Sequence, residues 1–424
     1  MITKIRLLGS ELALVGTGQV ISALGSVIGV RLMTGVLVPE VYGEVALAIT
    51  FITLIQQILV GPLSGALTRF FNVARENGEL PYFFGSSFSL GVKISLVTIG
   101  LLSVGALVLW LSGLSRYLVL ALFTLVFALV SGFNVLLDSI QTAARQRAVV
   151  AWHQGLGQWL RYLAAVGIVL AFGKVSAAAM AGYAAASVVV LGSQVFFFRR
   201  KMPVDPFQRL IPDKQWTGRL LSYALPFSSW GLFTWMQMTS DRWALQTFAN
   251  TTEVGYYTVL FQLGYYPLIM LTNVITQFAA PVLFGQAGDG SDPVRIRRAQ
   301  TNTWRLLGAA LVLTAVGVVA AWLLHPLIFR LFTAPEYHSV SGLFPIMVLS
   351  GGIFACGQIA SLMELNRGKP KTLLKPKIVM GIAGTLFNIA GAYWLGLNGV
   401  VYASAVFSGL YFVWILSLRR GDQS

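Results

Sequence analysis

Long apolar runs alternate with short polar connections along the chain of 424 residues. A helix needs about 20 predominantly apolar residues to cross the hydrocarbon core of a bilayer. The runs are too long and too uniformly apolar for the strands of a membrane barrel. The pattern therefore predicts an all-α membrane protein with twelve spans. Their expected bounds are Glu11 to Leu37, Gly43 to Thr68, Tyr82 to Leu111, Tyr117 to Ile140, Val149 to Phe172, Ser176 to Phe198, Leu220 to Phe248, Val254 to Phe284, Trp304 to Leu324, Val340 to Met363, Leu373 to Leu395 and Gly399 to Leu418.

The longest internal polar stretch, residues 199–219, divides the spans into six and six. It predicts an N-terminal six-helix lobe (1–198), a cytoplasmic linker (199–219) and a C-terminal six-helix lobe (220–424). Because six is an even number, both halves enter the membrane from the same side, which predicts a parallel repeat. Gly43 and Gly255 are 212 residues apart and stand in similar surroundings, which supports this repeat. Pro62 and Pro267 predict breaks in the spans that contain them.

Composition narrows the class of protein further. Hydrophobic residues make up 56% of the chain and charged residues 11%, against roughly 25% charged in a typical soluble domain. The single cysteine, Cys356, excludes a disulfide framework and a cysteine metal site. The three histidines are far apart, and no phosphate-binding glycine loop is evident. We therefore expect a membrane protein without a cofactor or a metal site, and not a soluble enzyme.

The formal net charge of +15 follows mainly from topology. If the N-terminus is cytoplasmic, 23 of the 30 lysines and arginines fall in cytoplasmic segments and 3 in outer loops. Cytoplasmic loops are enriched in these residues, so both termini are expected in the cytoplasm. No nucleic-acid partner is needed to explain the charge. The first apolar run contains Arg31, and we interpret it as a retained span and not as a cleaved signal peptide.

Several stretches resemble one family of membrane proteins. The segment from Arg31 to Ala48, with Pro39-Glu40-Val41-Tyr42-Gly43 inside it, is similar to the first loop of polysaccharide flippases. The segments Leu67 to Glu79, Leu220 to Phe227 and Leu397 to Ala405 are similar to later motifs of the same proteins. Together they span essentially the whole chain. The chain therefore resembles the O-antigen (Wzx-type) branch of the multidrug/oligosaccharidyl-lipid/polysaccharide (MOP) exporter superfamily.

This resemblance implies two six-helix lobes around a central cavity. It also implies that an undecaprenyl-diphosphate-type lipid-linked oligosaccharide is flipped to the outer leaflet by alternating access. The expected location is a bacterial inner membrane, with a monomeric protein and with polymerase and chain-length proteins nearby. Coupling to a gradient of H⁺ or Na⁺ would be compatible with this class.

Four basic residues fall within or at the edge of spans. An arginine at the centre of a membrane helix costs at least about 2.5–3.5 kcal/mol, so it needs a partner, a wet cavity or a ligand. Guanidinium groups also match the geometry of phosphates. We hypothesise that a cationic cavity binds the diphosphate. The candidate residues are Arg31, Lys93, Arg161 and Arg242.

A structural interpretation remains open beside this one. Arg31 and Arg242 could reach the outer surface or pair with Asp241, Glu40 or Glu253, while Lys93 and Arg161 could bond to neighbouring helices. Asp138 and Glu364 are expected mainly to pair with Arg145 and Arg367. Asp138, Asp241 and Glu364 are also weak candidates for coupling.

Three other functions compete with an oligosaccharide flippase. A drug or cation antiporter of the same superfamily would favour carboxylates at the span centres, where this chain has bases. A membrane-embedded polymerase or ligase would need a larger outer loop than the one near Leu324 to Ser339. A flippase for a peptidoglycan precursor or teichoic acid would share the cationic chemistry, although twelve spans favour the oligosaccharide branch over the fourteen-span peptidoglycan branch.

Overall fold

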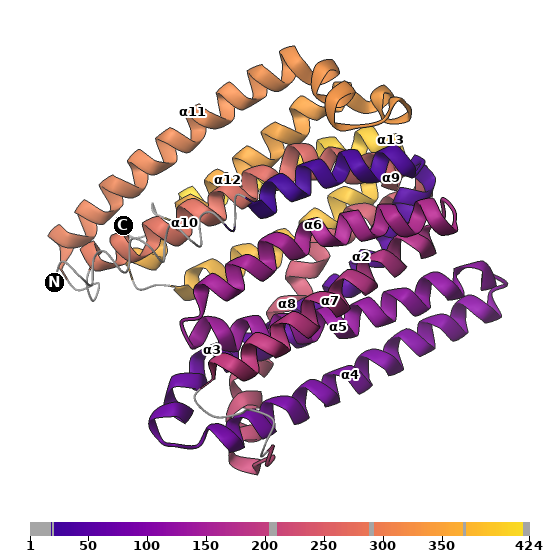
Figure 1. The fold of residues 1–424 in the computed structure, drawn as a ribbon. Coiled ribbons are helices and arrows are strands. Elements are labelled where there is room, and N and C mark those ends of the chain that lie inside the picture. Colours follow the sequence, from indigo (N-terminus) through magenta and orange to yellow (C-terminus); the bar gives the residue numbers. More distant parts are fainter. Residues whose placement is uncertain (1–17, 19–20, 203–209, 288–291, 368–369, 419–424) are drawn as a thin grey trace. The chain divides into compact units, whose positions relative to one another are not determined.

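The apolar runs form long helices, and the described residues of this computed structural model contain no strand (Figure 1). The structure describes residues 18, 21–202, 210–287, 292–367 and 370–418. The first predicted span and the predicted linker therefore lie partly outside the described residues. In chain order the helices are Ile21–Val36, α2 (Pro39–Ile55), α3 (Gly61–Glu76), α4 (Leu80–Leu111), α5 (Leu118–Ala143), α6 (Arg147–Phe172), α7 (Ser176–Lys201), α8 (Lys214–Phe248), α9 (Thr251–Leu260), α10 (Tyr266–Ala287), α11 (Pro293–Phe332), α12 (Phe344–Asn366) and α13 (Leu374–Ser417).

These helices account for the predicted spans. Nine helical segments of the described chain are long and apolar enough to cross a membrane. Two of them join two α-helices each: Pro39–Glu76 contains α2 and α3, and Thr251–Ala287 contains α9 and α10. Helix α13 contains the last two predicted spans. Its backbone leaves the helical region at Gly396 (φ 57°, ψ −135°), which separates the two. The helix Ile21–Val36 is apolar but shorter, and α8, which contains the seventh predicted span, has 35 residues but is not among those nine segments. The predicted all-α, multi-pass fold is confirmed.

The helices form two compact units. Unit 1 contains the described parts of Met1–Leu37 and of Glu44–Trp235. Unit 2 contains Val38–Gly43 and the described parts of Met236–Ser424. The chain passes between the units inside helices: the first turn of α2 belongs to unit 2, and α8 divides after Trp235.

Helix α8 begins at Lys214 because Asp213 caps it. The carboxylate of Asp213 accepts a hydrogen bond from the backbone N–H of Trp216 at 2.8 Å. Ser86 on α4 holds the same residue, since its hydroxyl accepts from the Asp213 N–H at 2.9 Å and donates to the Asp213 carbonyl at 3.1 Å. The ring of Trp216 packs edge-on against Phe83, with centroids 5.6 Å apart. The start of α8 is thereby fixed to α4 within unit 1.

The first turns of α2 and α9 pack together in unit 2 through a pair of glycines. A β-carbon on Gly43 would overlap the carbonyl oxygen of Thr251, and a β-carbon on Gly255 would overlap the carbonyl oxygen of Pro39. The contact is reciprocal, because Pro39 precedes Gly43 by four residues just as Thr251 precedes Gly255. Two glycines 212 residues apart thus occupy equivalent positions, as a parallel repeat requires.

Each half also breaks its second membrane helix at a π-helical turn that is followed by proline. The turn Gln56–Val60 precedes Pro62, and the turn Phe261–Tyr265 precedes Pro267. Both the turns and the prolines are 205 residues apart. Proline lacks an N–H and its ring clashes with the carbonyl four residues earlier, so the helix must widen on its N-terminal side. The breaks predicted at the two prolines occur as these turns.

The last hairpin of each half turns at a glycine with a positive φ angle and is held by a glutamate. In unit 1 the turn is at Gly173 (φ 115°), and the Ser176 hydroxyl donates to the Glu44 carboxylate at 2.6 Å. In unit 2 the turn is at Gly396, and the backbone N–H of Leu397 donates to the Glu253 carboxylate at 2.7 Å. Both glutamates lie near the start of the second helix of their half. The repeat therefore includes the hydrogen bond between this glutamate and the last hairpin.

Replacing Gly43 by leucine should destabilise the protein, because the new side chain must displace the backbone of α9. The expected cost is about 1–3 kcal/mol, the usual range for overpacking a tight contact. It would be measured as a lower unfolding temperature of the purified protein in detergent. The matched control is Gly35→Leu, because a β-carbon at Gly35 meets no atom within 4 Å. Equal stability of the two variants would contradict the glycine contact.

Candidate functional site

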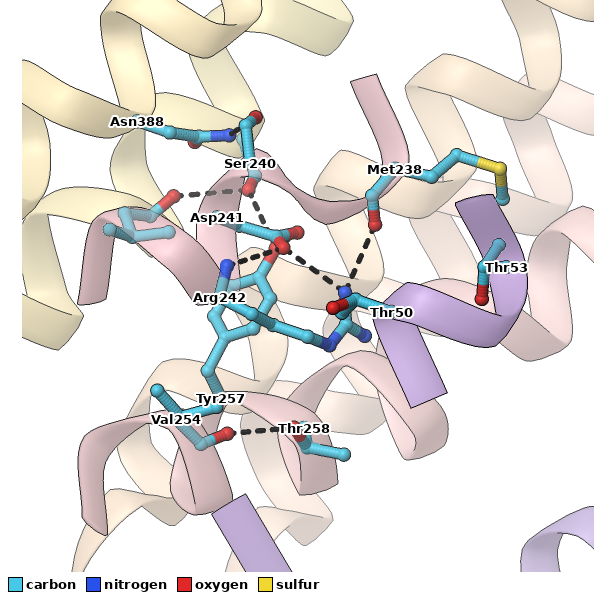
Figure 2. Close-up of polar contacts among 12 residues, drawn as sticks. Thr50, Thr53, Met238, Ser240, Asp241, Arg242, Val254, Tyr257, Thr258 and Asn388 are labelled. Carbon is cyan, nitrogen blue, oxygen red and sulfur yellow. Dashed lines mark hydrogen bonds and ion pairs between the residues drawn. The ribbon is translucent and has the colours of Figure 1, made fainter. Parts of the chain in front are cut away.

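Arg242 and Asp241 form a buried ion pair in the second half of α8 (Figure 2). Their side chains are 10% and 5% exposed, and Nη1 of the arginine lies 3.0 Å from Oδ1 of the aspartate. The same nitrogen donates to the Met238 carbonyl at 3.0 Å, and the backbone N–H of Arg242 donates to Oδ1 at 2.7 Å. One charge therefore offsets the other in a segment that water does not solvate freely.

Helix α9 holds the second oxygen of this carboxylate, and α13 contacts the residue that does so. The hydroxyl of Tyr257, a residue only 1% exposed, donates to Oδ2 of Asp241 at 2.7 Å. The same hydroxyl lies 3.3 Å from Oγ of Ser404 on α13. Both carboxylate oxygens are thus hydrogen-bonded, which lowers the cost of keeping the charge buried.

Aromatic rings form one wall around the guanidinium of Arg242. Its Cζ lies 4.7 Å from the ring centroid of Phe261 and 5.6 Å from that of Tyr257. Phe261 is the first residue of the π-helical turn ahead of Pro267. A cation over an aromatic face gains about 0.5–2 kcal/mol, with the larger values in desolvated sites. The break in the helix therefore carries one of the rings that stabilise this arginine.

The ring of Phe261 is itself supported by a column of stacked rings inside unit 2. Tyr265 lies 5.0 Å from it, Phe354 lies 6.0 Å from Tyr265, and Tyr411 lies 5.2 Å from Phe354, all measured between centroids. The column joins the π-helical turn to α12 and α13. Phe261 cannot shift far without repacking it, so the aromatic wall beside Arg242 is rigid.

Asn388 ties a further part of α13 to this region of α8, since its Nδ2 donates to the Ser240 hydroxyl at 2.9 Å. We call this group of side chains the Arg242 cluster; its members are Ser240, Asp241, Arg242, Tyr257, Asn388 and Ser404. In the part of the chain that the structure describes, Nε and Nη2 of Arg242 donate no hydrogen bond. Those donors are suited to an anionic group such as a phosphate.

The other three predicted cations lie in unit 1 and have different surroundings. Arg31 lies on the helix Ile21–Val36 with an exposed side chain, and its carbonyl accepts from the Thr34 hydroxyl at 3.3 Å. Lys93 is exposed on α4, beside Leu96 and Val97, which are 63% and 49% exposed. Neither residue is part of a buried polar cluster like that of Arg242.

Arg161 is half-buried on α6, near an acid of α5. Its Nε donates to the Gly157 carbonyl at 3.4 Å, and its charge acts on the carboxylate of Asp138. The hydrogen bonds to Asp138 come from Gln154 on α6 and Gln194 on α7, at 3.2 and 2.7 Å. Sequence reasoning expected Arg145 as the partner of Asp138, and these two glutamines were missed.

Glu364 lies at the end of α12 and is 3% exposed. It forms an ion pair with Arg367 at 3.0 Å, as expected from their spacing, and accepts from the Thr372 hydroxyl at 3.4 Å. Among the described residues, no group of three histidines, cysteines or carboxylates could hold a metal ion. The structure therefore pairs Arg242 with Asp241 and Arg367 with Glu364.

Ser404 lies inside the motif from Leu397 to Ala405, but nothing in that motif joined it to Tyr257 or Arg242. Ser404 is 147 residues from Tyr257, and Asn388 is 148 residues from Ser240. A polar residue inside an otherwise apolar span was the only sequence signal for either of them.

Replacing Asp241 by asparagine should destabilise the protein strongly, because Arg242 would remain buried without its counter-charge. A broken buried pair typically costs about 3–5 kcal/mol. The double variant Asp241→Asn/Arg242→Gln should recover part of that loss, since it removes both charges. Thermal unfolding of the purified variants in detergent measures both effects. A double variant less stable than Asp241→Asn would show that the pair is not what stabilises this part of α8.

Comparisons with known proteins agree with this architecture. The chain matches the family model of polysaccharide biosynthesis proteins over residues 8–285. An inward-facing multidrug resistance MATE family transporter of the MOP superfamily aligns with 95% of this chain and 96% of its own, at 19% identity and a TM-score of 0.74. An outward-facing structure of such a transporter aligns with 96% of this chain and 98% of its own, at 19% identity and a TM-score of 0.61.

A MOP superfamily transporter from Pyrococcus furiosus, described as having a binding pocket of reverse polarity and a different function, aligns with 96% of this chain and 94% of its own. Its identity is 18% and its TM-score 0.62. No curated protein sequence matches the chain. The family match covers well over half of the chain, and the structural matches cover nearly all of it. The chain therefore belongs to the polysaccharide biosynthesis protein family and has the fold of MOP superfamily transporters.

Proposed function

We propose that this protein is a flippase that moves a polyprenyl-diphosphate-linked oligosaccharide from the cytoplasmic to the outer leaflet by alternating access. Membership of the polysaccharide biosynthesis family and the transporter fold support transport, and not catalysis, as the general activity. The observation that carries the choice of substrate is the Arg242 cluster. It places a guanidinium with unused donors inside a membrane unit, where an anionic group is the natural ligand.

Arg242 fits a diphosphate better than a single negative charge. Its fork of donors matches two phosphate oxygens, and Asp241 engages only Nη1. The carboxylate keeps the arginine charged and oriented when no substrate is present. Arg31, Lys93 and Arg161 are proposed as further sites for the diphosphate. Replacing each of them by glutamine tests its role in the same assay.

The main competing function is export of cationic drugs, because several structural neighbours are multidrug transporters. The neighbour from Pyrococcus furiosus is described by a pocket of reverse polarity, so one fold can hold pockets of different charge. In this chain the Asp241 carboxylate is hydrogen-bonded through both oxygens and paired with an arginine. A carboxylate in that state is a poor receptor for a cation, which favours the anionic substrate.

Several finer features belong to the same proposal. The excess of lysine and arginine in alternate loops supports a bacterial inner membrane protein with both termini in the cytoplasm. We expect a monomer that acts beside polymerase and chain-length proteins. Asp138, Asp241 and Glu364 are the acids through which a gradient of H⁺ or Na⁺ could act.

Flipping in proteoliposomes tests the proposal. A polyprenyl-diphosphate oligosaccharide is incorporated, and its accessibility to a lectin or a hydrolase from one side is followed with time. The native protein should accelerate its movement. Arg242→Lys keeps the charge but loses the fork, and it should slow movement roughly tenfold or more, the kinetic equivalent of about 1.5–3 kcal/mol for hydrogen bonds to a charged group.

Two variants separate loss of binding from loss of folding. Asp241→Asn/Arg242→Gln removes the guanidinium without leaving an unpaired charge, and it should also be slow. Arg330→Gln, an exposed residue at the end of α11, should move substrate at the native rate. Full activity of both Arg242 variants would place the diphosphate elsewhere. A folded native protein that exports cationic drugs but moves no lipid-linked saccharide would overturn the proposal.

A further inference from the structure

A stripe of polar side chains runs along one face of α5 inside unit 1. Ser131, Asn134, Asp138 and Gln141 are spaced by three or four residues, which places them on the same side of the helix. The stretch from Asn134 to Gln141 covers about 10 Å of helix axis. Four polar residues on one face are unusual in an apolar span, because each must find a hydrogen-bond partner there.

The carboxylate of Asp138 is the centre of this stripe. Its Oδ1 accepts from Nε2 of Gln194 at 2.7 Å, and its Oδ2 accepts from Nε2 of Gln154 at 3.2 Å. Gln194 is 1% exposed, whereas Gln154 is exposed on the surface of α6. One side of the carboxylate is therefore buried and the other reaches the surface of unit 1, which gives an ion a route to it.

Several buried amide groups of unit 1 lack hydrogen-bond partners, and one of them belongs to Gln194, which bonds this carboxylate. Among the described residues, nine buried side-chain atoms have no hydrogen-bond partner, and five of them belong to amides of unit 1. They are the oxygens of Asn134, Gln141, Gln146 and Gln194 and the side-chain nitrogen of Gln141. Native proteins pair nearly all such atoms, so a group of exceptions needs an explanation, such as water or an ion.

Oε1 of Gln194 is the most informative of these atoms. The amide of Gln194 points its nitrogen at Asp138 and leaves its oxygen without a partner. That orientation suits an ionised carboxylate, which can only accept hydrogen bonds. A protonated carboxyl would instead need an acceptor, and a half-turn of the same amide would supply Oε1. One glutamine can therefore satisfy both states of Asp138.

Other titratable or charged groups lie on the helices packed around α5. On α6, Arg161 acts on the Asp138 carboxylate electrostatically, but the two side chains form no ion pair among the described residues. His153, also on α6, has both ring nitrogens engaged, with the Val149 carbonyl at 2.8 Å and the Ser193 hydroxyl at 2.9 Å. On α3, Thr68 reaches the Ser139 carbonyl at 3.4 Å, and the neighbouring Arg69 is exposed. In the sequence beyond the C-terminal end of α5, the next charge is Arg145.

We infer that Asp138 is a reversible proton-binding site of unit 1, with Gln194 as a positioning residue that changes its amide orientation when the proton arrives. The proton comes from water at the Gln154 side and forms an O–H bond on the carboxyl group. The Gln194 amide then accepts from that hydroxyl. The site would let a proton gradient act on the unit, and only this consequence rests on the proposed transport function.

Infrared difference spectroscopy tests the site without any transport. Purified protein in lipid nanodiscs is titrated over about pH 5 to 9, the range in which a buried carboxyl can change state. The native protein should develop the carbonyl stretch of a protonated carboxyl, and Asp138→Asn should lose that band. Glu364→Gln, which removes a buried acid of unit 2, should keep it.

Gln194→Leu tests the positioning role of Gln194 through the frequency of the infrared band, which a purely structural role would leave unchanged. Without Oε1 the protonated carboxyl lacks its acceptor, so the band should persist but shift to higher frequency. Asp138→Glu should retain a band at an altered frequency, which covers the case in which Asp138→Asn does not fold. A band that survives Asp138→Asn unchanged, or that disappears in Glu364→Gln, would overturn the assignment.

Proteoliposomes with an imposed pH gradient then address the consequence. The gradient should change the rate of flipping by the native protein and should leave the rate of Asp138→Asn unaffected. Native protein that flips its substrate with no response to the gradient would contradict coupling through Asp138. Absence of flipping with an intact infrared band would instead count against the proposed function and leave the proton site standing.

Discussion

The cost of a charge inside a membrane is the constraint on which the rest of this structure depends. Arginine, lysine and carboxylates cannot remain in the spans without partners or water. In unit 2 the solution is an ion pair of adjacent residues, Asp241 and Arg242. The Tyr257 hydroxyl donates to the carboxylate, and aromatic faces pack against the guanidinium. In unit 1 the solution is the carboxylate of Asp138, which accepts hydrogen bonds from two amides. The two halves share a repeat in backbone but differ in the chemistry they bury.

Much of the fold could be predicted because membrane helices leave strong signals in a sequence. Apolar runs of the right length gave the spans, and the division at Gly396 inside α13 agrees with the break expected between the last two. Gly43 and Gly255 could be matched because only glycine permits the close contact of α2 and α9. The π-helical turns could not be predicted as such, since proline signals a break without specifying how the preceding turn adapts.

The candidate site was harder to predict. Asp241 was recognised as a partner for Arg242 because the two are neighbours in sequence, but Ser404 reaches Tyr257 from 147 residues away. Lys93 was a candidate because of its depth in a span, and the structure adds that it is exposed beside Leu96 and Val97. Depth follows from residue counting, but the direction of a side chain depends on how helices pack. Gln154 and Gln194 were missed because an amide carries no charge to attract notice.

The central claim is that this protein recognises the anionic head of a lipid-linked saccharide, and direct binding tests it most directly. Native mass spectrometry of the purified protein would compare a polyprenyl-diphosphate oligosaccharide, the corresponding polyprenyl alcohol and a cationic drug. The account predicts a complex with the diphosphate that the alcohol and the drug do not displace. Preferential binding of the drug, or equal binding of the alcohol and the diphosphate, would contradict it.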